Sequence, residues 1–208
     1  MRNVFRCQPL GYALVCLLAA PLAVTAQTST AKPAAAQAPA KKGAAAPAKP
    51  SPDAGPTVVV ETVKGTFEFE TYPGDAPKSV EHILALVKRN FYNGQRVHRV
   101  EPGFVVQFGD PKTRDMTKRD SWGQTAGGGS GKPIGVAEIS KTHLHTKGAV
   151  GLAHAGDAAQ GDSQIYVMLG DRPALNGKYA VIGRVLSGMD VVQKLQVEDI
   201  IKKVSIRQ

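Results

Sequence analysis

The chain has 208 residues, a formal net charge of +9 and two cysteines. Both cysteines lie in the first 26 residues, and residues 1–56 carry more than half of the net positive charge. The remainder mixes Lys and Arg with Asp and Glu, so its composition gives little support to a nucleic-acid partner, and none is expected. It also contains no cysteine, which excludes disulfides and thiol chemistry from residues 57–208.

The N-terminal segment has the pattern of a secretory signal peptide. Arg2 and Arg6 precede an apolar run from Leu10 to Val24, and Val24-Thr25-Ala26 supplies small residues for cleavage after Ala26. The run is short and poorly flanked for a transmembrane helix, so we expect no stable membrane insertion after cleavage. An uncleaved N-terminal anchor is the alternative. We predict that residues 1–26 are a signal peptide.

Residues 27–56 are almost entirely Ala, Pro, Lys, Ser, Thr and Gln, without any large aliphatic or aromatic side chain. Such a segment cannot bury enough apolar surface to offset the entropy lost on ordering. We predict a disordered, partly extended tether. It acts either as a cell-envelope spacer or as a solvated tail without a specific partner.

Residues 57–208 are long enough for one domain with a sizeable core. Apolar runs on either side of Lys64-Gly65 predict a first hairpin. A helix then follows, with Asp75 or a neighbour as its cap and Pro77 in its first turn. Its apolar residues recur at helical spacing and are expected to face the core: Val80, Ile83, Leu84 and Val87.

The stretch from Val97 to Asp110 predicts two short apolar strands joined by a tight turn at Glu101-Pro102-Gly103. Strict alternation would place Val97 and Arg99 on one face of the first strand. An Arg in an apolar strand is costly to bury unless its charge is paired or solvated. It therefore either faces water or an ion partner, or projects with Gln107 beside an apolar pocket.

Residues 111–133 are polar and glycine-rich, and Pro133 stands where a phosphate loop needs Ser or Thr. We predict a surface loop that can border a substrate groove. His143, His145 and His154 lack a further ligand at convincing spacing, so no metal site is expected.

The rest of the chain contains several further short apolar segments between polar turns, and only one more helix-like stretch, after Met189. Many short strands with two helices predict a mainly β protein with a closed or nearly closed antiparallel barrel.

The run His98-Arg99-Val100-Glu101-Pro102-Gly103-Phe104-Val105-Val106-Gln107 resembles, position by position, the signature of the cyclophilin family of peptidyl-prolyl cis-trans isomerases. Three further segments are similar to that family: residues 148–154, Ser163-Gln164-Ile165-Tyr166, and residues 175–183. The resemblance covers residues 57–208. It implies a closed eight-stranded antiparallel β-barrel capped by two α-helices and, with the signal peptide, the periplasmic branch of bacterial relatives.

The resemblance also implies a function, which is acceleration of X-Pro isomerisation during folding of exported proteins. Arg99 and Gln107 would be catalytic, with no metal or cofactor. The substrate-binding residues it implies are Phe104, Val105, Ala153, His154, Gln164, Ile165, Tyr166, Leu175 and Tyr179. The expected partners are proline-containing unfolded polypeptides, the expected location is the periplasm, and the expected state is a monomer. A non-catalytic chaperone or proline-peptide-binding module with the same fold is the alternative.

Several positions depart from the family pattern, among them Ile165-Tyr166 in place of Phe-Phe, Tyr179 in place of a frequent His, and an unusual Phe108. Ala174 replaces a frequent Trp, which bears on cyclosporin binding more than on catalysis. Val105 replaces a frequent Met, and Glu101 is unusual at its position. These changes predict a roomier pocket than the family norm.

Overall fold

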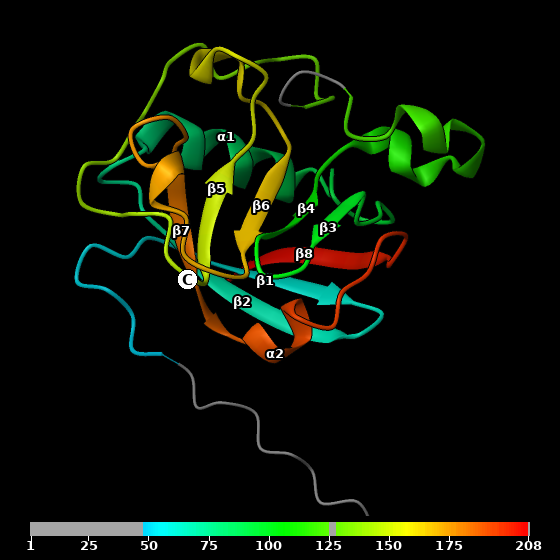
Figure 1. Cartoon of the computed structure of the whole chain (residues 1–208), viewed down its shortest axis with the longest axis horizontal. Helices are drawn as coiled ribbons and strands as arrows, with labels where there is room; N and C mark the ends of the chain where they lie inside the picture. The colour runs from blue at the N-terminus through cyan, green and yellow to red at the C-terminus, as the bar shows by residue number, and fades with distance from the viewer. Residues whose placement is uncertain (1–47, 125–127, 208) are drawn as a thin grey trace, which may run out of the picture. The chain divides into compact units, whose positions relative to one another are not determined.

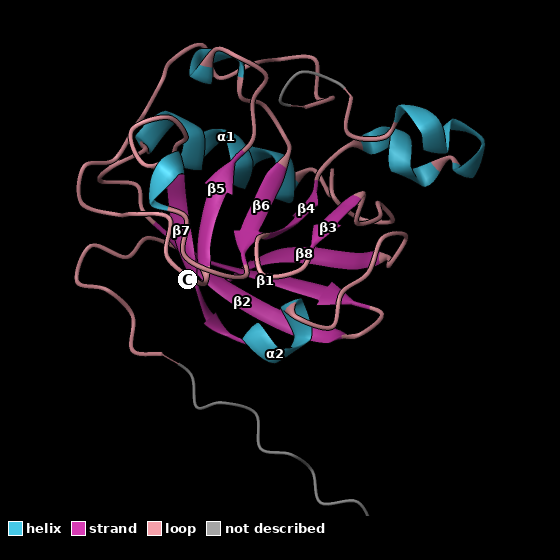
Figure 2. Ribbon diagram, in the orientation of Figure 1, coloured by secondary structure: helices cyan, strands magenta, loops and turns pink. Residues whose placement is uncertain are grey.

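The computed structural model of the protein describes residues 48–124 and 128–207. Most of the regular structure is strand, joined by long loops (Figure 2). The strands are β1 (Thr57–Thr62), β2 (Gly65–Thr71), β3 (Arg99–Glu101), β4 (Val105–Phe108), β5 (Ala149–Leu152), β6 (Ile165–Met168), β7 (Val181–Ser187) and β8 (Ile201–Arg207). The helices are α1 (Pro77–Lys88) and α2 (Met189–Val192), with short 3₁₀ turns η1 (Pro111–Arg114), η2 (Met116–Ser121), η3 (Ala158–Gln160) and η4 (Pro173–Leu175).

The eight strands form one antiparallel sheet in the order β3-β4-β6-β5-β7-β2-β1-β8. The sheet bends strongly, so that β1, β2 and β8 cross below the other strands in Figure 1. The helices α1 and α2 lie at opposite ends of the sheet in the same view. The predictions of a mainly β fold, eight antiparallel strands and two helices are confirmed.

The predicted closure of the barrel is wrong, because no strand ladder joins the edge strands β3 and β8 in the described residues. The residues just before each strand approach each other instead. A single bridge pairs Arg96 with Ile200, and the Val97 amide donates to the Asp199 carbonyl at 2.9 Å. β3 spans only three residues and begins after this contact, so β3 itself does not pair with β8, and the sheet is an open half-barrel.

Strand alternation divides the buried side chains between the two faces of the sheet. On β6, Ile165 and Val167 enter the main core, whereas Tyr166 and Met168 belong to a second apolar cluster on the other face. Successive residues of a strand point to opposite faces, so this division follows directly from the period of two. The second cluster forms the floor of the candidate site described below.

Helix α1 buries the apolar stripe that the sequence predicts, including Val80, Ile83 and Val87. Its N-terminus differs from the prediction, because its N-cap, Ala76, makes no side-chain capping bond. The Glu138 carboxylate accepts hydrogen bonds from the first-turn amides of Lys78 (3.0 Å) and Ser79 (2.8 Å) instead. A carboxylate near a helix N-terminus is favoured by the helix dipole as well as by these free amides.

Residues 48–56, which the sequence assigns to the tether, make defined contacts with β2 and β7. The Ala48 amide donates to the Leu186 carbonyl at 2.7 Å. Ser51 donates to the buried carboxylate of Glu70 through its amide at 2.8 Å and through its hydroxyl at 2.7 Å. The predicted signal peptide and residues 27–47 of the tether lie outside the described residues.

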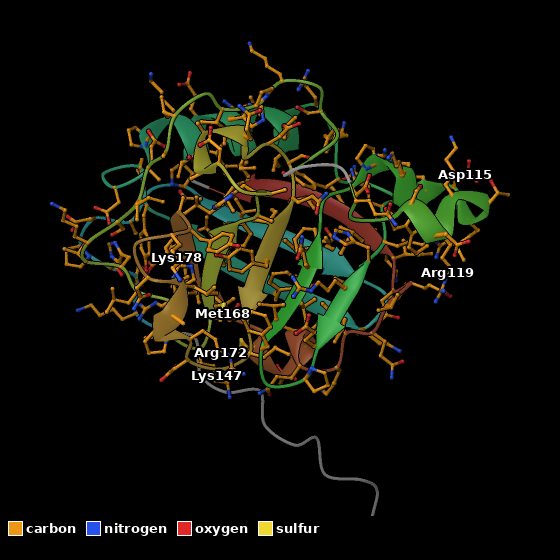
Figure 3. All side chains as sticks on the ribbon, turned by 45° about the horizontal axis from the view of Figure 1, so that its top comes forward. Asp115, Arg119, Lys147, Met168, Arg172 and Lys178 are labelled. Atoms are coloured by element: carbon orange, nitrogen blue, oxygen red, sulfur yellow. The ribbon has the colours of Figure 1, made fainter. Side chains whose placement is uncertain are left out.

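The segment after β4 forms the surface loop that the sequence predicts. The turns η1 and η2 project to one side of the domain, where Asp115 and Arg119 are labelled in Figure 3. Gly128 is needed near the end of this loop, because a Cβ atom there would lie 2.4 Å from the amide nitrogen of Ser163. Within the described ranges, no helix combines the length and apolar character needed to span a bilayer.

Candidate active site

A pocket of about 290 Å³ opens on the face of the sheet that carries the second apolar cluster. It is assembled from β3, β4 and β6, the chain after β5, and η4. Its lining residues are Arg99, Phe104, Val105, Gln107, Gly123, Gln124, Ala153, His154, Ala155, Gln164, Tyr166, Leu175 and Tyr179.

A chain of polar side chains crosses one side of the pocket. Arg99 Nη1 donates to Gln107 Oε1 at 3.2 Å, and Gln107 Nε2 donates to Gln164 Oε1 at 2.8 Å. Gln107 and Gln164 are buried, whereas the Arg99 side chain is 46% exposed. Buried polar groups need such partners, and the result is a guanidinium at the rim that is held by an anchored amide.

The side that Arg99 faces depends on where the regular pairing of β3 begins. Arg99 lies opposite Gln107 in the strand register, yet the His98 amide also donates to the Gln107 carbonyl at 3.1 Å. Val97 and His98 precede β3, so the alternation within the strand does not extend back to Val97. Val97 and Val100 both contact the main core, while Arg99 faces the pocket, so the predicted shared face of Val97 and Arg99 is wrong.

Aromatic rings form the opposite wall. Tyr166 and Tyr179 meet edge to face with ring centroids 6.2 Å apart, and His154 stacks on Tyr179 at 4.3 Å. The hydroxyl of Tyr166 and Nε2 of His145 lie 2.8 Å apart. Burial raises the pKa of Tyr166 and lowers the pKa of His145, so both groups are neutral near pH 7. The Tyr166–His145 pair therefore adds no charge to this wall.

Phe104 forms the end of the pocket next to Arg99. The guanidinium carbons of Arg99 and Arg172 lie 5.6 Å and 5.2 Å from its ring centroid. A cation within about 6 Å of an aromatic centroid is attracted to the ring face. The two arginines thus help to hold the ring of Phe104 in place.

The structure brings together every predicted site residue except one. Arg99, Gln107 and eight of the nine predicted substrate-binding residues line the same pocket. Ile165 does not, because it neighbours Tyr166 on β6 and enters the main core, where it is 2% exposed. Two adjacent strand residues cannot both face one pocket, so the prediction for Ile165 is wrong.

Three lining residues were not predicted: Gly123, Gln124 and Ala155. The first two belong to the polar loop that was expected to border a groove, but nothing in its composition singled them out. Ala155 directly follows Ala153 and His154 in the sequence. A substrate peptide that runs along those two residues would also reach Ala155, so its position could have been predicted.

No group of three or more potential metal ligands gathers among the described residues. Three of the histidines have side-chain partners of their own. His82 lies 2.9 Å from Asp162, His143 lies 2.6 Å from Asp75, and His145 contacts Tyr166. The arrangement can bind an extended apolar peptide and present a guanidinium to it.

Together the half-barrel and its pocket define a class of protein: a mainly β scaffold with an arginine at the rim of a pocket lined by aromatic and aliphatic side chains. The family model for cyclophilin type peptidyl-prolyl cis-trans isomerase matches residues 57–208. The chain belongs to this family of enzymes.

Relatives identified by sequence carry the same activity in their names. A "Probable peptidyl-prolyl cis-trans isomerase" of Brucella abortus is 41% identical over 140 residues, which cover 67% of this chain and 71% of the relative. "Peptidyl-prolyl cis-trans isomerase B" of Bacillus subtilis is 36% identical over 140 residues, covering 67% of this chain and 90% of the relative.

A solved structure has the same fold. It is a cyclophilin type isomerase of Cryptosporidium parvum, crystallised in the presence of the dipeptide Ala-Pro. Its TM-score is 0.63 at 24% identity, with 73% of this chain and 99% of that chain covered.

Proposed function

We propose that this isomerase acts on X-Pro bonds of exported polypeptides in the periplasm, and that Arg99 stabilises the twisted imide. The proposal rests above all on the juxtaposition of the Arg99 guanidinium with the apolar pocket wall formed by Phe104, Tyr166 and Leu175. The Cryptosporidium relative studied with Ala-Pro supports a proline-containing substrate.

The chemistry requires no bond to be broken. Rotation about an X-Pro bond has a barrier of about 20 kcal/mol and takes tens to hundreds of seconds unaided. Twisting removes the amide resonance and leaves a lone pair on the prolyl nitrogen. A group that binds the twisted form better than either planar form lowers the barrier.

Arg99 suits this role because a guanidinium stays protonated at any relevant pH. Its anchor, Gln107, is itself held by Gln164, so the donor is fixed before substrate arrives. Fixed donors aimed at developing charge cost no reorganisation during the reaction. The prolyl ring would fill the apolar pocket and exclude water from the imide.

A prolyl-peptide isomerisation assay on the wild type and Arg99→Ala tests this mechanism. We expect kcat/KM of Arg99→Ala to fall roughly 100-fold, the usual cost of removing one preorganised donor. Arg119→Ala is the matched control, because Arg119, on η2 (Figure 3), is a similarly exposed arginine that forms an ion pair with Glu198 outside the pocket. Equal rates for wild type and Arg99→Ala would refute the role of Arg99.

The alternative, a non-catalytic chaperone or proline-peptide-binding module, predicts peptide binding by a wild type that accelerates nothing. The same assay separates the two. The location is tested by fractionation of cells that express the full chain or a chain without residues 1–26. We expect only the full chain to reach the periplasm.

A further inference from the structure

Glu101 makes a second contact with the arginine at the pocket rim. Its Oε1 accepts hydrogen bonds from Arg99 Nε at 2.7 Å and from Arg99 Nη2 at 2.5 Å. Gln107 accepts from the remaining nitrogen, Nη1, at 3.2 Å. The guanidinium therefore lies between a carboxylate on one side and an amide oxygen on the other.

This ion pair adds little to the stability of the fold. The side chains of Arg99 and Glu101 are 46% and 49% exposed, and exposed pairs contribute about 0–1 kcal/mol. Its geometric effect is larger. A guanidinium has five N–H donors in one rigid plane. In Arg99, each of the three nitrogens already donates one hydrogen bond to Glu101 or Gln107. The plane can no longer turn freely.

The backbone fixes both acceptors. Glu101 and Arg99 are two residues apart on β3 and so share a face. Glu101 lies opposite Val105 in the register, and its carbonyl accepts from the Phe104 amide at 2.9 Å, which closes the turn. Gln107 lies on β4 and is anchored to Gln164 on its other side. The strand register thus places both acceptors within hydrogen-bond distance of the guanidinium.

We propose that Glu101 is a positioning residue for isomerisation, which holds the Arg99 guanidinium in the orientation that meets the prolyl nitrogen. This inference rests on the proposed function of Arg99. Glu101 does not line the pocket, so it acts through Arg99 and not on the substrate. Without it, Arg99 samples other rotamers, and only part of the enzyme is poised at any time.

The test compares Glu101→Ala with Glu101→Gln, whose amide oxygen can still accept from Nε and Nη2. We expect kcat of Glu101→Ala to fall about tenfold, since small misplacements of reacting groups cost up to about 100-fold. KM should change by less than about twofold, because an interaction made only in the transition state was lost. Glu101→Gln should keep most of the wild-type kcat.

Asp190→Ala is the control, because it breaks a comparably exposed ion pair between Asp190, on α2, and Lys194, outside the pocket. It should match the wild type in kcat, and all variants should share its urea unfolding midpoint. Wild-type kcat in Glu101→Ala would overturn the inference. So would a change in KM alone, or a Glu101→Gln variant as slow as Glu101→Ala.

A second readout does not depend on activity. The Nε–H resonance of Arg99 in NMR spectra should be ordered and slow to exchange with water in the wild type and in Glu101→Gln, and averaged in Glu101→Ala. If the wild type fails to accelerate isomerisation while this pattern holds, the proposed function is wrong, but Glu101 still orients Arg99. If the resonance is equally mobile in all three proteins, Glu101 does not orient Arg99 and the inference is wrong.

Discussion

Replacing Gly151 with Ala should damage both stability and activity through one neighbour, Tyr166. A Cβ atom at Gly151 would lie 2.3 Å from both Cζ and Oη of Tyr166. Carbon atoms in contact normally lie about 3.5–4.0 Å apart, so the ring must move by more than about 1 Å. Gly151 has no positive φ, so the backbone itself tolerates Ala and the clash is the whole effect.

Tyr166 cannot yield cheaply. Its hydroxyl bonds to His145 at 2.8 Å, its ring packs edge-on against Tyr179, and the residue is only 5% exposed. Overpacking costs about 1–3 kcal/mol, and a disrupted buried hydrogen bond adds about 1–3 kcal/mol. We expect Gly151→Ala to lose about 2–6 kcal/mol of stability, which lowers Tm by roughly 4–24 °C for a domain of this size.

Thermal unfolding and the prolyl-peptide assay should be run together. kcat/KM should fall with Tm, because Tyr166 lines the pocket. Gly74→Ala is the matched control, since its Cβ would meet nothing within 4 Å and its φ is not positive. In a Tyr166→Ala background, Gly151→Ala should cost much less. A Gly151→Ala protein as stable as Gly74→Ala, or additive costs in the double variant, would refute this reasoning.

Two further predictions concern buried ionisable groups. Burial lowers the pKa of His98 from 6.5 to about 4, so the native state binds fewer protons than the unfolded chain between those values. The free energy of unfolding is therefore unaffected by this group above pH 6.5 and falls as the pH drops toward 4, by about 2–3 kcal/mol at pH 4.5. Urea unfolding at pH 7 and 4.5 should show a smaller difference in this free energy for His98→Gln than for the wild type, and an equal difference would refute the prediction. Glu70→Gln should cost about 1–3 kcal/mol, because a buried charged partner of Ser51, Tyr72 and Arg184 is weakened, and hydrogen exchange at the Ser51 amide should accelerate; an unchanged exchange rate would show that Glu70 does not hold residues 48–56.

The linear order of residues carries the local structure. Pro102-Gly103 predicts the turn between β3 and β4, and the helical spacing of apolar residues predicts α1. The contiguous run from His98 to Gln107 carries the family resemblance. Most of the pocket residues were predicted from this resemblance.

The period of two could also have excluded Ile165. Adjacent to Tyr166 on one strand, it had to face the opposite side of the sheet. The family resemblance and the strand alternation thus give opposite predictions for Ile165, and its position in the main core agrees with the alternation.

Other features depend on residues far apart in the chain. The cap of α1 comes from Glu138 instead of Asp75, which lies beside the helix but accepts from Thr142 at 3.0 Å and pairs with His143. Burial of Glu70 beneath Ser51 likewise has no local signal. Such pairings are fixed by how the sheet folds back on itself.

What the sequence alone determined about this protein is its family, its strands and turns, and the identity of the arginine. What the tertiary structure decided is which way that arginine points and what holds it. Regular pairing begins at Arg99, opposite Gln107, and its side chain lines the pocket. There it donates hydrogen bonds to Glu101 and Gln107. These are questions of register and of side-chain geometry, which a periodic pattern in one strand leaves open because the partner strand sets them.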